Sequence, residues 1–377
     1  MNTTWRQCTI GDVCDTISNT YNSNAQQVVL INTSDVLEGK VLNHIYIPNE
    51  NLKGQFKKTF EEGDILYSEI RPQNKRYAYI DFAPINYIAS TKLMVIRNKN
   101  IVKSKYLYYF LQSDKIISEL QMLAETRSGT FPQITFNELS KLSIKIPPLP
   151  EQDRIISILD SICKKIDINQ QINDNLEEQA KALFKSWFVD FDRNEWVHCE
   201  LGDITLITAG GDRPSKYTNK KTIECHVPIY SNGIDNEGLY GYTNVAKIHE
   251  ESITISARGT IGYVCLRLEP YVPIVRLISI IPNKKELSAK YLYLWALTQN
   301  ITGTGTTQQQ LTVPIFRKTP ISIPSDTKLK QFNSIADPLF SQIESNKKEN
   351  IKLSTLRDTL RPKLMSGEIS VEEVSLD

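Results

Sequence analysis

Several loops of this 377-residue chain carry side chains that donate and accept hydrogen bonds, next to glycines that permit close approach of the backbone. Arginine and lysine bind the edge of guanine through two hydrogen bonds, and glutamine or asparagine binds adenine in the same way. Hydroxyl groups and further cations suit the phosphates of a nucleic acid. These residue types predict a surface that contacts double-stranded DNA. The candidate contact residues are Arg71, Gln73, Asn74, Lys75, Arg76, Lys92, Thr130, Gln133, Arg213, Ser215, Lys216, Asn232, Arg258, Thr260, Arg276, Thr306 and Gln308.

The same loops also fit plain solvated connections between strands, and the residue types alone leave both interpretations open. Charge adds modest support for a DNA surface. Residues 1–145 hold 17 basic against 14 acidic residues, and residues 193–325 hold 14 against 11. The segments that follow these blocks, 146–192 and 326–377, are net negative instead. Phosphates are attracted to the first kind of block and repelled by the second.

Motifs of enzymes that act on nucleic acids are missing from the sequence. It has no GxxxxGK[ST] loop for nucleotide phosphates. The stretch closest to the Asn/Asp-Pro-Pro-aromatic run of adenine methyltransferases is 337–340, which falls within a helical pattern. The four histidines, at 44, 198, 226 and 249, form no metal-binding motif. We therefore expect a chain without catalytic residues, metal or bound cofactor.

Sequence features also bear on the compartment. The six cysteines form no CxxC pair, which predicts reduced thiols rather than a disulfide framework. No apolar run approaches the roughly 20 residues that span a bilayer, and residues 1–20 carry no signal-peptide core. These features predict a soluble cytoplasmic protein without a membrane partner.

The two basic blocks are copies of one another. Residues 5–13 (WRQCTIGDV) reappear at 196–204 (WVHCELGDI), 105–108 (KYLY) at 290–293, and 144–147 (IKIP) at 321–324 (ISIP). The order is kept while the offset falls from 191 to 185 and then 177, so the second copy is a shorter version of the first. This pattern indicates a tandem duplication.

Each block is followed by a heptad pattern. From Ile155 to Trp187, apolar or amide residues recur in alternating steps of 4 and 3. The same seam returns from Phe332 to Leu364, with one charged interruption at Arg357. Such a seam is typical of a coiled coil. Pro150 and Ser325 suit helix starts. We expect helices over 151–188 and 328–365, paired antiparallel about a pseudo-two-fold axis.

The antiparallel arrangement predicts a register in which the numbers of facing residues add up to 519. Asn169 then faces Asn350, and Asn173 faces Asn346. Amides inside a seam penalise slipped alignments, because slippage would bury an amide without a partner. These asparagines would fix the length of a spacer, unless they face solvent on a rotated helix. We expect core packing, rather than base stacking, of the aromatic residues Phe184, Trp187, Phe188, Phe191 and Trp196.

The residues from 147 to 188 resemble the helical region of type I restriction-modification specificity (S) subunits. The resemblance rests on PPLPEQ at 147–152, IISILD at 155–160 and LFKSWF at 183–188. The stretches VPIYSNGI at 227–234 and ISARGTIG at 255–262 resemble a target-recognition domain of that family. The two-fold layout is also the family's, so the resemblance covers the whole chain.

This resemblance implies a mixed α+β fold with target-recognition domains at 1–146 and 193–325, and helical spacer regions at 147–192 and 326–377. Each recognition domain would read one half of a bipartite, asymmetric DNA site, and the helix pair would set the gap between the halves. Two methyltransferase (M) subunits and the restriction (R) subunits would dock on this non-catalytic chain. Those partners would use S-adenosylmethionine, ATP and Mg²⁺. The complex would lie in a prokaryotic cytoplasm, associated with the nucleoid.

The sequence departs from the family pattern at two places. The second helix begins PSDTKL at 324–329 in place of PPLPEQ, so a partner contact inferred at Glu151 and Gln152 would not carry over. The first block lacks the GGDRPS run at 210–215, which indicates a different recognition class. An alternative function is a coiled-coil adaptor whose globular ends bind proteins without reading DNA. The DNA sequence itself cannot be derived, because it depends on loop geometry and DNA deformation.

Overall fold

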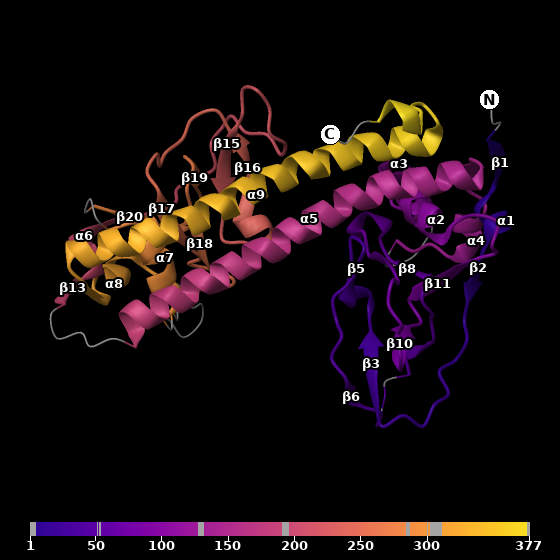
Figure 1. Ribbon diagram of the computed structural model, residues 1–377, viewed down its shortest axis with the longest axis horizontal. Helices are drawn as coiled ribbons and strands as arrows, with labels where there is room; N and C mark the ends of the chain where they lie inside the picture. The colour runs from indigo at the N-terminus through magenta and orange to yellow at the C-terminus, as the bar shows by residue number, and fades with distance from the viewer. Residues whose placement is uncertain are drawn as a thin grey trace. The chain divides into compact units, whose positions relative to one another are not determined.

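The computed structural model describes residues 5–50, 52, 54–126, 132–190, 196–283, 287–299, 301 and 311–374. Its backbone contacts divide the chain into two compact units (Figure 1). Unit 1 comprises residues 1–167 and 350–377, and unit 2 comprises residues 168–349. Each unit therefore holds one of the duplicated blocks together with part of each long helix.

Unit 1 contains two four-stranded sheets, with strand orders β2-β11-β8-β9 and β6-β3-β10-β7. In β11, Met94 and Ile96 face a core shared with helices, whereas Leu93 and Val95 face the second sheet. A strand covered on both faces needs a continuous apolar run, which LMVI at 93–96 supplies. The elements of the first block are β1 (Arg6–Thr9), α1 (Ile10–Val13), β2 (Cys14–Ile17), β3 (Gln27–Ile31), β4 (Val36–Leu37), β5 (Lys40–Val41), β6 (Ile47–Pro48), β7 (Phe56–Lys58), β8 (Ile65–Ser68), β9 (Tyr77–Tyr79), β10 (Tyr87–Ser90), β11 (Leu93–Asn98), α2 (Ser104–Leu111), α3 (Asp114–Glu125), α4 (Phe136–Ser140) and β12 (Ser143–Ile146).

Unit 2 repeats this plan in a shorter form. Its four-stranded sheet has the order β14-β20-β17-β18, and a second sheet has the order β16-β15-β19. Isoleucines of β17 and β20 pack in a core with residues of α7 and of both long helices. The elements of the second block are β13 (Val197–Glu200), α6 (Leu201–Ile204), β14 (Thr205–Ala209), β15 (Val227–Tyr230), β16 (Leu239–Thr243), β17 (Ser252–Ile255), β18 (Val264–Arg267), β19 (Val272–Pro273), β20 (Ile278–Pro282), α7 (Ala289–Leu297), α8 (Val313–Arg317) and β21 (Pro320–Ile323).

The duplication seen in the sequence is also a duplication of structure. The first strand of each block pairs antiparallel with its last strand, Arg6 opposite Ile146 in one block and Val197 opposite Ile323 in the other. Each block also has one parallel strand pair, β3 with β10 and β15 with β19. In the four-stranded sheets, β8 and β9 occupy the same places in the strand order as β17 and β18, so these two hairpins correspond. The mixed helix-and-sheet class predicted from the sequence is confirmed.

Two long helices follow the blocks, as predicted. Helix α5 (Leu149–Phe184) has 36 residues and continues into a π-helical turn at Lys185–Val189. Helix α9 (Asp326–Ser366) has 41 residues. The backbone N–H of Lys328 donates to Ser325 Oγ at 3.4 Å, so Ser325 caps the second helix. The ends lie within a few residues of the predicted 151–188 and 328–365 because the heptad pattern marks the buried length of each helix.

The helices run antiparallel within each unit. In unit 1, residues at the start of α5 share a core with Leu364 and Met365 at the end of α9. Further along, Asn350 Nδ2 donates to the carbonyl of Ile166 at 3.2 Å. In unit 2, Asn346 Nδ2 donates to Asn173 Oδ1 at 2.8 Å, so this predicted pair is in contact and is buried. Asn169 donates to the carboxylate of Glu349 at 2.6 Å, a contact that the register prediction did not include.

Aromatic side chains close unit 2 where the helices meet the second block. Phe332 is fully buried, and its ring centroid lies 5.0 Å from Phe188 and 6.4 Å from Trp187. The ring centroid of Trp196 lies 5.8 Å from that of Phe188. These contacts confirm core packing for the four described aromatic residues of the predicted cluster. Phe191 lies outside the described residues.

Gln152 has a structural role in unit 1. Its side chain is 1% exposed, accepts a hydrogen bond from the backbone N–H of Lys103 at 2.8 Å and donates to the carbonyl of Pro147 at 2.9 Å. Gln152 is therefore not available for a partner contact, because its amide satisfies two backbone groups of its own chain. The corresponding residue of the second copy is Leu329, which is also buried.

Within the described residues, no helix combines the length and hydropathy needed to cross a bilayer. The six cysteines all lie within the described residues and form no disulfide, and three of them are buried. The described residues contain no group of three or more His, Cys, Asp or Glu side chains that could hold a metal ion.

Candidate nucleic-acid interface

In unit 1, the first candidate loop joins β8 to β9. It contains a 3₁₀ turn at Pro72–Asn74, flanked by Arg71 and Lys75, which have φ angles of 45° and 52°. Positive φ is uncommon for residues with a side chain and costs about 1–3 kcal/mol where the surroundings enforce it. Arg71, Gln73 and Asn74 are exposed. The loop therefore presents a guanidinium and two amides from a bent, constrained backbone.

Glu69 joins this loop to two others. Its backbone N–H donates to the carbonyl of Lys92 at 3.0 Å, and its carbonyl accepts from the backbone N–H of Ile134 at 2.9 Å. The backbone N–H of Arg71 donates to the carbonyl of Pro132 at 3.1 Å. Segments near 70, 92 and 133 are thus held together, which places the predicted contact residues Lys92 and Gln133 beside the loop of Arg71.

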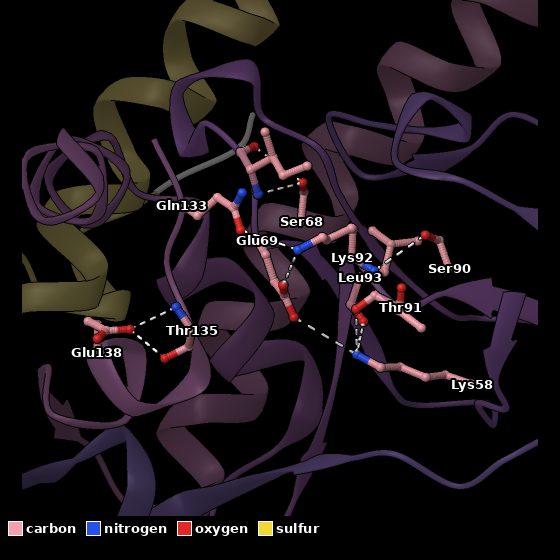
Figure 2. A network of polar contacts seen from close by, with 11 residues as sticks. Lys58, Ser68, Glu69, Ser90, Thr91, Lys92, Leu93, Gln133, Thr135 and Glu138 are labelled. Atoms are coloured by element: carbon pink, nitrogen blue, oxygen red, sulfur yellow. Dashed lines mark hydrogen bonds and ion pairs between the residues drawn. The ribbon is translucent and has the colours of Figure 1, made fainter. Parts of the chain in front are cut away.

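The side chain of Glu69 lies between two lysines (Figure 2). Its carboxylate is 4.0 Å from Lys58 Nζ and 3.9 Å from Lys92 Nζ. Lys58 donates to the carbonyls of Thr91 and Leu93, at 3.0 and 2.8 Å. Burial lowers the pKa of Lys58, and the charge of Glu69 partly offsets this effect. Lys58 is therefore a structural cation that bonds the segment of residues 91–93, whereas Lys92 is exposed and donates to Gln133 Oε1 at 3.3 Å.

We expect Glu69→Gln to lower the pKa of Lys58 further, because the substitution removes the negative charge that favours the protonated amine. The titration of the Lys58 side chain, followed by ¹³Cε chemical shift in isotope-labelled protein, measures this change. Glu62→Gln serves as the control, since Glu62 is an exposed carboxylate in the turn before β8. Equal pKa values in wild type and Glu69→Gln would contradict the proposed role of Glu69.

Two other predicted residues of unit 1 hold neighbouring turns. Arg76 Nη1 donates to the carbonyls of Ser34 and Val36, at 3.0 and 3.3 Å. Lys75 Nζ lies 3.7 Å from the carboxylate of Glu38. These contacts attach the end of the β8–β9 loop to residues 34–38.

In unit 2, the corresponding loop joins β17 to β18. Arg258, Gly259 and Thr260 are exposed at its tip, and Gly259 has a φ of 68°. The backbone N–H of Ala257 donates to Asn232 Oδ1 at 2.8 Å, and Asn232 Nδ2 donates to the carbonyl of Val275 at 2.7 Å. The amide of Asn232 thus joins the loop of Arg258 to the turn of Arg276. In this structure it positions two loops.

A third loop of unit 2, before β15, carries three more candidates. The guanidinium of Arg213 lies 4.0 Å from the ring centroid of Tyr217, and its Nη1 donates to the hydroxyl of Tyr240 at 3.1 Å. Stacking of this kind fixes the direction of an exposed arginine. Ser215 is exposed, and Lys216 forms an ion pair with Glu224 at 2.7 Å.

Comparison with known proteins decides the family. A family model described as "Type I restriction modification DNA specificity domain" matches residues 2–178 and 193–355, one copy for each duplicated half. The chain belongs to this family. It is a specificity subunit of a type I restriction-modification system and carries DNA-recognition domains. An adaptor without sequence readout is not favoured by this match.

Relatives of this specificity subunit match over most of their length. The chain is 33% identical to the HindI specificity subunit of Haemophilus influenzae, over 97% of this chain and 99% of that protein. It is 28% identical to the MjaIX specificity subunit of Methanocaldococcus jannaschii, over 78% of this chain and 77% of that one. The crystal structure of an S subunit from M. genitalium shares the fold, with a TM-score of 0.54 at 18% identity, covering 97% of this chain and 96% of that one.

For the specificity subunit, direct DNA contact by the predicted residues stays a prediction. Three of them, Thr130, Thr306 and Gln308, lie outside the described residues. Sequence reasoning missed Glu69, although a carboxylate directly after a buried strand, at the start of a loop with two arginines, was a visible signal. It also missed the conformation of residues 275 and 276, for which the sequence gives no signal.

Proposed function

We propose that each unit of this specificity subunit reads one half of a bipartite, asymmetric DNA site. The observation that carries the proposal is the repeated hairpin, β8–β9 and β17–β18, each with an exposed arginine in its loop. Arg71 and Arg258 are the residues that we assign to base edges, since arginine binds guanine through two parallel hydrogen bonds. Different loop sequences on equivalent hairpins would give different half-sites.

We further propose that the paired long helices set the number of unread base pairs between the half-sites. The buried Asn173–Asn346 hydrogen bond supports this role, because one aligned amide pair disfavours every shifted alignment of the seam. A spacer with one preferred alignment has one preferred length.

The chain would act as a non-catalytic scaffold in this proposal. Methyltransferase subunits, and then restriction subunits, would dock on it and supply chemistry that depends on S-adenosylmethionine, ATP and Mg²⁺. Such a complex would work on DNA in a prokaryotic cytoplasm, at the nucleoid. Sequencing of methylated bases in the host tests the proposal, since a bipartite motif with a fixed gap is expected. Methylation without a bipartite motif would contradict it.

Binding of the purified complex of this chain and its methylating partner gives a second test. We expect sequence preference together with a steep fall in affinity as salt increases, because phosphate contacts release counterions. Binding that is insensitive to both sequence and salt would favour the adaptor function instead.

We expect Arg258→Ala to weaken recognition of the second half-site by about 1–3 kcal/mol and to leave the first unchanged, because a bidentate base contact is lost. Arg71→Ala is the matched variant, with the opposite expectation. Competition binding with duplexes altered in one half-site at a time measures both effects. Equal losses at both half-sites in either variant would contradict the assignment of one half-site to each unit.

A further inference from the structure

The connection between β19 and β20 in unit 2 has an unusual backbone. Val275 and Arg276 are consecutive and have φ angles of 53° and 61°. For a β-branched residue such as valine, positive φ is a true outlier, because Cβ crowds the neighbouring carbonyl. Val275 is nevertheless 48% exposed, so burial of its side chain does not explain the conformation. Strain of this kind persists only where the surroundings impose it, and it gathers at functional sites.

Three hydrogen bonds impose the conformation. The backbone N–H groups of Val275 and Arg276 donate to the carbonyls of Gly211 and Gly210, at 2.8 and 2.9 Å. The carbonyl of Val275 accepts from Asn232 Nδ2 at 2.7 Å. Gly210 is required for this approach, since a Cβ there would lie 2.7 Å from the backbone nitrogen of Ile274. The turn is therefore built into the domain from three separate segments of the chain.

Two exposed cationic residues, Arg276 and Lys247, lie next to the segments that form this turn. Arg276 follows Val275 directly and is exposed. Lys247 is exposed as well, and its Nζ would lie 3.2 Å from a Cβ on Gly211. Through Asn232, the turn is tied to Ala257, the residue before Arg258. An exposed apolar side chain next to cations suits binding to DNA. The cations can bind phosphates while the apolar side chain contacts an apolar part of a base.

We propose that Val275 is a specificity-determining residue that contacts the methyl group of a thymine in the second half-site. In the major groove, thymine alone among the DNA bases presents a methyl group, and an apolar side chain is its natural partner. Gly210, Gly211 and Asn232 are positioning residues that hold Val275 in place. This inference rests on the proposed reading of a half-site by unit 2, and it adds the chemical feature that is read.

Deoxyuridine, which pairs like thymine but lacks the methyl group, tests the inference. The reconstituted complex with the methylating partner is titrated with duplexes in which each thymine position of the second half-site, on either strand, is replaced in turn. We expect one replacement to weaken wild-type binding by about 3–10-fold, in line with the loss of one buried methyl group. In Val275→Ala, the same replacement should change affinity less than about 2-fold, because the two Cγ methyl groups proposed to reach the thymine methyl group are removed.

Two further variants separate this contact from other roles. Val245→Ala is the matched control, since Val245 is an exposed valine of the same unit, and it should keep the wild-type preference for thymine. Gly210→Ala keeps Val275 but displaces the turn, and it should lose that preference.

The proposal is overturned if no thymine of the second half-site is sensitive in wild type, or if Val275→Ala keeps the wild-type discrimination. Weaker assembly of Val275→Ala with the methylating partner, together with unchanged discrimination in the complex that still forms, would assign the residue to a protein partner instead. If wild type shows no sequence preference at all, the proposed reading of DNA fails, which is a distinct outcome.

Discussion

Insertion of one heptad into both long helices, between Gln171 and Ile172 and between Lys347 and Lys348, should widen the gap in the recognised site by about three base pairs. One heptad keeps the seam in phase and adds roughly 10 Å to a helix, while each base pair of DNA rises about 3.4 Å. The two insertion points face one another in the register of the Asn173–Asn346 contact, so the facing segments stay matched. Sequencing of methylated sites in cells that carry the variant measures the gap.

The control is the same insertion in one helix only. The two seams then no longer match in length, and we expect loss of folding or of methylation rather than a new gap. An unchanged gap in the double-insertion variant would refute the helix pair as the spacer. That result would not bear on the proposal that each unit reads one half-site.

Phe332→Ala should lower the free energy of unfolding of unit 2 by about 3–5 kcal/mol. Phe332 is fully buried, and rings of Phe184, Phe188, Trp187 and Tyr291 surround it with centroids between 5.0 and 6.4 Å away. Truncation leaves a cavity, and the neighbouring rings cannot move to fill it because they are packed against one another. The loss is expected in denaturant unfolding followed by tryptophan fluorescence, since three of the four tryptophans lie in unit 2.

Ile335→Ala is the matched control for this prediction. Ile335 lies on the same helix, just after Phe332, and is 44% exposed. Removal of a half-exposed side chain costs little, since little apolar surface returns to water. Similar losses in the two variants would show that the aromatic cluster is not the core of unit 2.

The elements with strong periodicity could be predicted from the sequence. The heptads determine both long helices, because their buried faces repeat over the whole length of each helix and average out local irregularity. The π-helical turn at 185–189 was not predicted, since it extends the helix without changing the residue pattern. The paired end strands of each block follow from the duplicated motifs, which would not recur at both ends of a block without a common structural role.

The candidate site was predictable in residue type and not in conformation. Asn232 was assigned to DNA on its chemistry, yet its amide is bonded to Ala257 and Val275. The strained turn depends on Gly210 and Gly211, which lie far from it along the chain, before β15. Hydrogen bonds between such distant segments leave no periodic trace, so short-range patterns cannot reveal them.

The first and last strands of each block pair antiparallel, β1 with β12 and β13 with β21. This strand pair lets the segment between its strands change independently of the following helix. The register of the pair is the same in both copies, with Arg6 opposite Ile146 and Val197 opposite Ile323. The segment enclosed by those strands is nevertheless shorter in the second copy than in the first. Insertions, deletions and wholesale replacement of the enclosed segment would therefore leave the path of the chain into the following helix unaltered. A lineage could acquire a new target sequence by exchanging one interior while its scaffold stays the same.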